Sequence, residues 1–134
     1  MLETWSDQIL EDTAFRISTP AAEKKIAEWN PGRPDAVAMY RFIKERKFGA
    51  GCIEAWAAEK DALCDKLSSL LEPLGRTLAQ QPFLLGEKPT LADAAVYGNF
   101  FMIEMVLPGR MKTIAPAMSE WYARVDAARA PART

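Results

Sequence analysis

Residues 81–98 have the sequence QPFLLGEKPTLADAAVYG, which joins a turn-rich connector to the start of an apolar helix. Thr90 and Asp93 have the spacing of a capping box. In such a box the threonine hydroxyl accepts a hydrogen bond from the backbone amide of residue 93, and the aspartate carboxylate accepts one from the backbone amide of residue 90. The helix extends to about Glu104 and is apolar on nearly every side, which is typical of a buried helix. We therefore expect it at the centre of the domain.

Apolar residues at three-to-four spacing predict further helices N-terminal to this one. A first helix is expected over residues 2–17, and Ser18-Thr19-Pro20 should end it. A second helix is expected over residues 21–29, because proline is tolerated at the start of a helix. After the breaker at residues 30–32, a third helix over residues 34–47 ends in a basic cluster. We interpret this cluster as a solvated face, with an anion or partner contact as the alternative.

The most regular apolar spacing predicts one long helix from Cys52 to about Gln80. Pro73 removes a backbone donor inside it, so we expect a bend near Ser69. A last helix is expected over residues 116–129, and residues 130–134 should fray. Because strand-like alternation is missing, we predict a single all-α domain over residues 1–129, built as an orthogonal bundle of about five to seven helices.

Composition excludes several functions. The chain has 134 residues, a net charge of −1 and no histidine. The lack of histidine excludes Ser-His and Cys-His catalytic pairs and His-ligated zinc, and we expect no metal site. A nearly neutral charge argues against nucleic-acid binding, and no apolar run has the length of a membrane span. The acidic, amphipathic N-terminus is unlike a signal peptide, so we expect a cytoplasmic protein that binds neither nucleic acid nor membrane.

The two cysteines, Cys52 and Cys64, lie on the same predicted helix. Twelve helical steps separate their Cα atoms by about 18 Å, which is too far for a disulfide bond. We expect both thiols to be reduced and mostly buried. The alternative for Cys52 is a reactive thiol, because a helix N-terminus favours the thiolate.

The connector and central helix resemble the C-terminal helical domain of the glutathione transferases. In that family a P-F/Y-L-x-G-x-x-P/L-S/T-x-A-D pattern joins two helices, and Thr90 and Asp93 stand at the positions of its capping box. Ala115-Pro116 with Trp121 is similar to the family's last helix, and residues 49–56 look like certain bacterial members. The resemblance covers essentially the whole chain.

The resemblance implies a division of labour between two domains. A complete family member has a thioredoxin-like domain of about 80 residues that binds glutathione and stabilises its thiolate. The sequence contains nothing similar to that domain, so no catalytic residue is carried over. The family's electrophile pocket is lined by the first long helix and part of the central one. The candidate substrate-binding residues at those places are Trp5, Ile9, Asp12, Tyr97 and Phe101.

Three functions remain open. The first is the helical domain of a glutathione transferase-like protein, inactive until a thioredoxin-like domain in cis or trans supplies glutathione as co-substrate. On its own, this domain would bind no cofactor. The second is a stand-alone helical module for protein–protein interaction, and the third is an enzyme that uses Cys52 as nucleophile. Apolar surface left uncovered by the missing domain would also favour a homodimer through the first helix or the long helix.

Overall fold

The computed structural model describes residues 2–129, apart from the side chain of Glu3, and it confirms the all-α class. The expected frayed tail, residues 130–134, lies outside the described residues. In chain order the helical elements are α1 (Leu2–Trp5), the π-helical turn η1 (Ser6–Leu10), α2 (Glu11–Trp29), α3 (Pro34–Phe48), α4 (Cys52–Ala58), α5 (Lys60–Leu78), α6 (Leu91–Val106), α7 (Arg110–Ile114), the 3-10 turn η2 (Pro116–Met118) and α8 (Ser119–Ala128).

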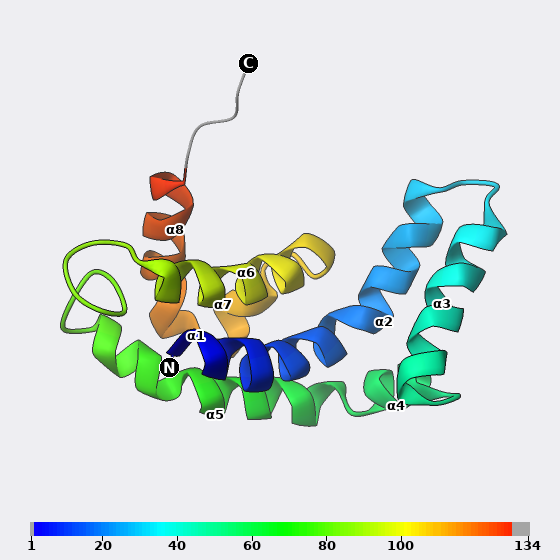
Figure 1. Cartoon of the computed structure of the whole chain (residues 1–134), viewed down its shortest axis with the longest axis horizontal. Helices are drawn as coiled ribbons and strands as arrows, with labels where there is room; N and C mark the ends of the chain where they lie inside the picture. The colour runs from blue at the N-terminus through cyan, green and yellow to red at the C-terminus, as the bar shows by residue number, and fades with distance from the viewer. Residues whose placement is uncertain (1, 130–134) are drawn as a thin grey trace, which may run out of the picture.

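The helices are arranged as a bundle with a projecting pair. Figure 1 shows α2 leaving the bundle and returning as α3, so that the two form an antiparallel hairpin at one end of the molecule. We call residues 20–48, the outer part of α2 together with α3, the arm. Helix α2 packs on α3, α4, α5 and α6, and it therefore connects the arm to the bundle.

Helix α6 is the centre of the bundle, as its apolar composition predicts. Val96, Phe100 and Ile103 are each at most 2% exposed. The ring of Phe100 meets the fully buried Trp121 of α8 edge to face, with centroids 5.3 Å apart. Asn99 is a buried polar residue on this helix, and its amide donates a hydrogen bond of 3.0 Å to the hydroxyl of Ser6. This bond fixes α6 against η1.

The expected capping box is confirmed, and its carboxylate has additional partners. One oxygen of Asp93 accepts the backbone amide of Thr90 at 2.9 Å. The other accepts the backbone amide of Leu84 at 2.9 Å and the indole N–H of Trp121 at 2.8 Å. Because Asp93 is only 1% exposed, these bonds take the place of water around a buried carboxylate. The side chain thus joins the connector, the start of α6 and helix α8.

The predicted break at Ser18-Thr19-Pro20 is wrong, because α2 continues through Pro20 to Trp29. A proline inside a helix leaves one carbonyl without its usual amide partner. In the turn before Pro20, the hydroxyls of Ser18 and Thr19 both donate hydrogen bonds to the carbonyl of Phe15, at 3.1 Å and 2.7 Å. Both side chains are buried, so tertiary packing holds the helix together here.

The single long helix predicted from Cys52 to Gln80 is also wrong, because it divides at Glu59 into α4 and α5. Helix α5 then continues unbroken through Ser69 and Pro73. The amide of Glu59 bonds to the carbonyl of Ala55, and the amide of Leu63 bonds to the carbonyl of Glu59. The helical spacing is therefore kept across the division, and the apolar pattern contains no sign of it.

We expect Asp93→Ala to destabilise the domain far more than Thr90→Ala does. Loss of the threonine cap should lower the free energy of unfolding by about 1 kcal/mol. Loss of the carboxylate also leaves the Leu84 amide and the Trp121 indole buried without partners, which raises the cost to about 3–5 kcal/mol. Urea denaturation measures both values, and the exposed control Asp65→Ala should stay within about 0.5 kcal/mol of wild type. Equal effects of the Thr90 and Asp93 variants would show that the additional bonds contribute nothing.

Candidate functional site

A hollow of about 360 Å³ lies where the arm joins the bundle, and we call it the arm hollow. Its floor is apolar, with Ile17, Trp56 and Val106 each less than 9% exposed. These residues come from α2, α4 and the last turn of α6. The other lining residues are Pro20, Ala21, Lys24, Lys25, Glu28, Ala57, Lys60 and Leu107.

The rim of the arm hollow is basic. Lys24, Lys25 and Lys60 stand against a single acidic residue, Glu28, and the Lys25 ammonium pairs with the Glu28 carboxylate at 3.2 Å. Within the described part of the chain, neither Lys24 nor Lys60 forms an ion pair. Ligand sites in proteins commonly combine an apolar lining with a few polar groups that orient the ligand. The arm hollow can therefore accept an apolar molecule that carries a negative charge.

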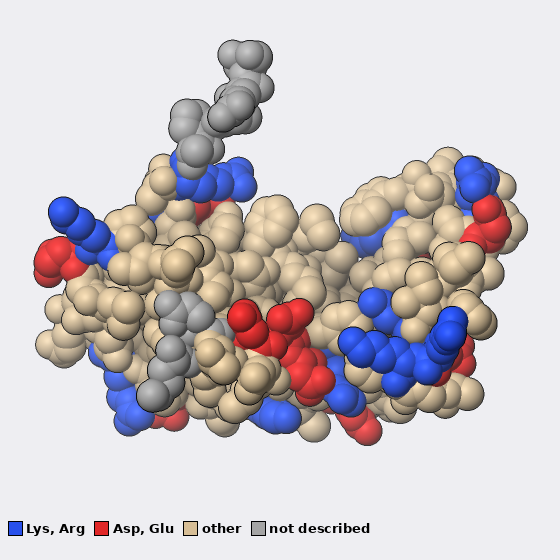
Figure 2. Space-filling view, in the orientation of Figure 1, with Lys and Arg blue, Asp and Glu red and all other residues tan. Residues whose placement is uncertain are grey.

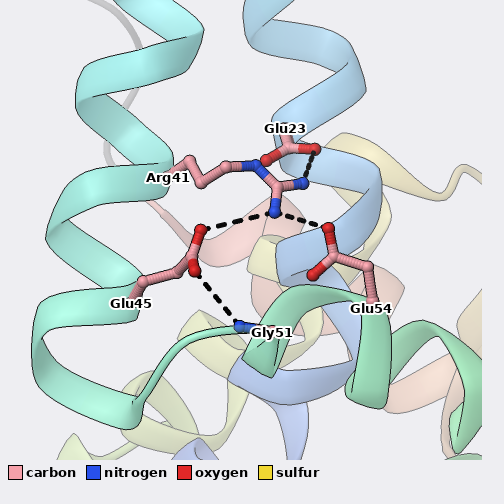
Figure 3. A network of polar contacts seen from close by, with 5 residues as sticks. All are labelled: Glu23, Arg41, Glu45, Gly51 and Glu54. Atoms are coloured by element: carbon pink, nitrogen blue, oxygen red, sulfur yellow. Dashed lines mark hydrogen bonds and ion pairs between the residues drawn. The ribbon is translucent and has the colours of Figure 1, made fainter.

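A network of charged side chains fixes the arm to α4, as Figure 3 shows. The guanidinium of Arg41 on α3 donates to Glu23 on α2 at 2.9 Å and to Glu54 on α4 at 2.5 Å. A longer contact of 3.4 Å joins it to Glu45, whose other oxygen accepts the backbone amide of Gly51. Three helices and the α3–α4 turn are thus connected through one guanidinium, the group best suited to contact several carboxylates at once.

The network changes the ionisation of its members. The pKa of Glu54 lies below its usual value of 4.5, first because its own backbone amide donates a hydrogen bond to the carboxylate and then because Arg41 does. The hydrogen bonds to Glu23 and Glu54 raise the pKa of Arg41. The second oxygen of Glu23 is buried and has no hydrogen-bond partner among the described residues. Arg41 is therefore the main compensation for a largely buried carboxylate.

The interpretation of the basic end of α3 as a solvated face does not fit Arg41 or Lys44. Arg41 lies in the network, and the Lys44 ammonium sits 4.4 Å from the centre of the Phe15 ring. Burial, followed by the nearby charge of Lys47, lowers the pKa of Lys44. The i,i+4 spacing of Arg41 and Glu45 was a visible signal, whereas Glu23 and Glu54 lie too far away in the sequence to be connected with it.

The first helix does not bring its three candidate residues into one site. Trp5 lines a shallow hollow against α5, beside Leu70 and Pro73. Asp12 instead pairs with Arg16 at 3.1 Å and borders a depression next to the basic end of α3. Figure 2 shows acidic side chains gathered over the first helices and basic ones beside them. The third candidate, Ile9, is 45% exposed.

Tyr97 and Phe101 lie together on α6, where their surroundings are part of the packing with α8. The Tyr97 ring stacks on Tyr122 at 4.9 Å and on Phe101 at 6.1 Å. Its hydroxyl donates to Asp126, and burial together with this carboxylate raises the pKa of Tyr97. These contacts hold α8 against α6, and neither residue lines the arm hollow.

The thiols of Cys52 and Cys64 are free. Cys52 is the first residue of α4 and only 7% exposed, whereas Cys64 is partly exposed. Residues 2–129 contain no group of three or more His, Cys, Asp or Glu side chains placed to hold a metal ion.

We expect slow alkylation of both thiols at neutral pH, with Cys52 slower than Cys64. Burial raises the pKa of Cys64, so less of it is thiolate at pH 7, and Cys52 is shielded by the core. Iodoacetamide labelling followed by mass spectrometry should give native rates at least about tenfold below those in urea. Faster labelling of Cys52 than of Cys64 would support the nucleophile hypothesis instead.

We expect Arg41→Gln to lower the free energy of unfolding by about 1–2 kcal/mol at pH 7, because it leaves Glu23 without its partner. A carboxylate whose pKa is lower in the folded state than in the unfolded state stabilises the fold at any pH above its unfolded-state pKa. This contribution is lost as the pH falls through the folded-state pKa. Wild type should therefore lose more stability than Arg41→Gln below about pH 4.5. Urea denaturation between pH 7 and pH 3 measures this. The control Arg76→Gln, in an exposed pair, should change little, and equal pH profiles for wild type and Arg41→Gln would contradict the role of the network.

In the comparison with protein families, residues 54–124 match the glutathione S-transferase C-terminal domain. The matched segment is more than half of the chain and runs from α4 into α8. Searches of curated proteins and of solved structures found no match. No helix within residues 2–129 combines the length and apolar content needed to cross a membrane. From the family match and the all-α bundle around a capped central helix, we conclude that the chain belongs to the glutathione S-transferase C-terminal domain family.

Proposed function

We propose that this domain is the electrophile-binding half of a glutathione transferase-like protein, and that the arm hollow is its substrate pocket. Family membership and the apolar floor formed by Ile17, Trp56 and Val106 support the proposal. The thioredoxin-like domain, in cis or in trans, would bind glutathione as co-substrate. The domain alone would then have no transferase activity. We place it in the cytoplasm, where its two thiols stay reduced.

The location of the arm hollow agrees with the pocket that the family resemblance implies. That pocket is lined by the first long helix and by part of the central helix. The arm hollow is lined by these two elements, α2 and the end of α6, together with α4 and Lys60, and it uses later positions than Trp5, Asp12, Tyr97 and Phe101. The observation that carries the proposal is this conjunction of an apolar floor with two basic residues, Lys24 and Lys60, at the rim.

The task of the helical domain in this reaction would be to position the electrophile. In a transfer to glutathione, the thiolate must be aimed at an electrophilic carbon that is held in place. A bound aromatic ring would rest on the apolar floor, and its negative group would lie near the lysines. The Arg41 network would keep the arm, which forms one wall, at a fixed distance from α4. The domain would thus contribute position, while the other domain activates the sulfur.

A protein–protein interaction module is the alternative function. The observation that favours it is the exposed apolar surface of α3, where Met39 and Phe42 are each 59% exposed. The two functions differ in what the arm hollow binds, since a pure interaction module has no use for a small-molecule pocket.

We expect a chloronitrobenzoate, an aromatic electrophile with a carboxylate, to shift the NMR amide signals of the residues lining the arm hollow. Ala57→Phe fills the hollow and should weaken binding at least about tenfold. The matched control Ala58→Phe lies next to the hollow on the same helix and should bind within about twofold of wild type. Glutathione alone should shift no signals.

The charge of the rim is tested with the same method. Lys60→Gln should weaken binding of the carboxylate probe but not of the neutral chloronitrobenzene. Two results would contradict the proposed substrate pocket: signal shifts confined to other parts of the domain, or equal affinities of Ala57→Phe and Ala58→Phe for the probe. Either result would leave the interaction module as the better hypothesis.

A further inference from the structure

One side of α6, which crosses the bundle between α8 and the arm in Figure 1, is open to solvent. Leu91, Phe101 and Met105 lie on this side and are 77%, 42% and 51% exposed. The small residues Ala94 and Gly98 lie between them and are exposed as well. The spacing i, i+3, i+7, i+10 and i+14 places all five on one helix face, over a length of about 21 Å. We call these five residues the α6 stripe.

The α6 stripe carries no charge. Helix α6 has two charged residues, Asp93 and Glu104, and neither belongs to the stripe. Asp93 is buried in the capping box, and the Glu104 carboxylate accepts the backbone amides of Gly109 and Met111, at 2.7 Å and 2.8 Å. Every exposed residue of α6 belongs to the stripe. A contiguous uncharged face of this kind is typical of a surface that binds another protein.

Packing within the domain does not explain Gly98 at the centre of the stripe. A glycine inside a helix is less favourable than an alanine. A Cβ atom at Gly98 would meet no atom of the described residues within 4 Å, so the fold of one chain does not require the missing side chain. Gly75 on α5 differs, because a Cβ atom there would lie 3.3 Å from the side chain of Ala117. At an exposed position, a glycine allows the backbone of a second helix to approach closely.

The α6 stripe is self-complementary when two copies of the helix pack antiparallel about a two-fold axis at Gly98. The axis pairs the other stripe residues, and the two half-buried residues beside them, with residues of the second copy: Leu91 with Met105, Ala94 with Phe101, and Ala95 with Met102. Small side chains therefore face large ones on both sides of the glycine. A closed two-fold interface requires that one surface fit itself in this way.

We propose that the outer face of α6 is a homodimer interface, in which two α6 helices pack antiparallel and cross at Gly98. Its three large side chains, Leu91, Phe101 and Met105, expose roughly 350 Å² per copy, taking about 200 Å² for a fully exposed side chain of this size. With the smaller residues between them, two copies bury about 1,000 Å² in total, which is near the lower limit for a specific interface. We therefore expect a dimer that dissociates on dilution.

The homodimer expected from the sequence thus moves to a third element. The sequence predicts the first helix or the long helix as the interface, whereas the α6 stripe lies on the central helix. The interface is independent of the proposed function, because no residue of the stripe lines the arm hollow. Binding of the chloronitrobenzoate probe should therefore be the same in variants that no longer dimerise.

Sedimentation equilibrium over a concentration series tests the interface, with circular dichroism to confirm that each variant is folded. Wild type should dimerise reversibly. Gly98→Leu should weaken the dimer at least about a hundredfold, because it separates the two helices where they cross. Ala94→Glu should have a similar effect, because it places a charge opposite Phe101. The control Ala62→Leu, at an exposed position of α5, should leave the dimer unchanged.

Two results of this series overturn the proposal. The first is a wild-type chain that stays monomeric at millimolar concentration, which would leave the α6 stripe to a different protein. The second is a dimer that a folded Gly98→Leu or Ala94→Glu variant does not weaken, which would place the interface elsewhere on the domain.

Gly98→Ala separates the effect of the glycine on the dimer from its effect on the chain. At concentrations where the chain is monomeric, alanine should raise the midpoint of thermal unfolding, because it favours the helix and meets no neighbour. At higher concentrations the same variant should weaken the dimer about tenfold, because the two backbones can no longer approach as closely. A destabilised monomer would show that the glycine serves the fold of one chain and would overturn the proposal.

Disulfide cross-linking tests the antiparallel direction. In the proposed dimer the two copies of Leu91 lie about 21 Å apart, as do the two copies of Met105, whereas Leu91 of one copy faces Met105 of the other. Leu91→Cys and Met105→Cys should therefore cross-link poorly when each is oxidised alone, and at least about tenfold more when they are mixed. The native thiols of Cys52 and Cys64 are present in every sample, so the wild-type chain gives the background. Equal cross-linking alone and in the mixture overturns the antiparallel arrangement.

Discussion

The buried carboxylate of Asp93 is the constraint on which the bundle depends. It is taken out of water almost completely, and such a group is tolerated only where hydrogen bonds replace its hydration. Those bonds come from three separate segments, the connector at Leu84, the start of α6 at Thr90 and helix α8 at Trp121. The three segments must therefore be positioned together, and the rest of the core packs around the helix that they fix. These bonds therefore also position the end of α6, which contributes Val106 to the arm hollow.

A second constraint acts at the other end of the molecule, where the arm leaves the bundle. Arg41 joins Glu23, Glu45 and Glu54, and the adjacent rings of Phe15, Phe48 and Trp56 pack against one another at 5.1–5.8 Å. A polar network and an aromatic cluster side by side oppose rotation of the arm in different ways. The polar network depends on ionised carboxylates, whereas the aromatic cluster depends on the exclusion of water from its rings. The space between the arm and α6 can therefore stay open while its walls remain ordered.

Local patterns predicted the parts of the structure that local forces decide. The capping box follows from the spacing of Thr90 and Asp93, and the burial of α6 follows from its apolar composition. The continuity of α2 through Pro20 could not be predicted, because it depends on packing that is remote in sequence. The substrate-binding candidates failed to converge for a related reason. Trp5 and Asp12 share one face of an ideal helix, but η1 intervenes and different neighbours cover the two ends of that face.

Helix α3 shows how composition can exceed what the fold of one chain requires. None of its residues is buried, and the exposed side chains of Met39, Phe42 and Ile43 contribute nothing to the core. The helix is held instead by its inner side, through Arg41 and the ring contacts of Lys44. Exposed apolar residues at helical spacing are costly in water unless something covers them.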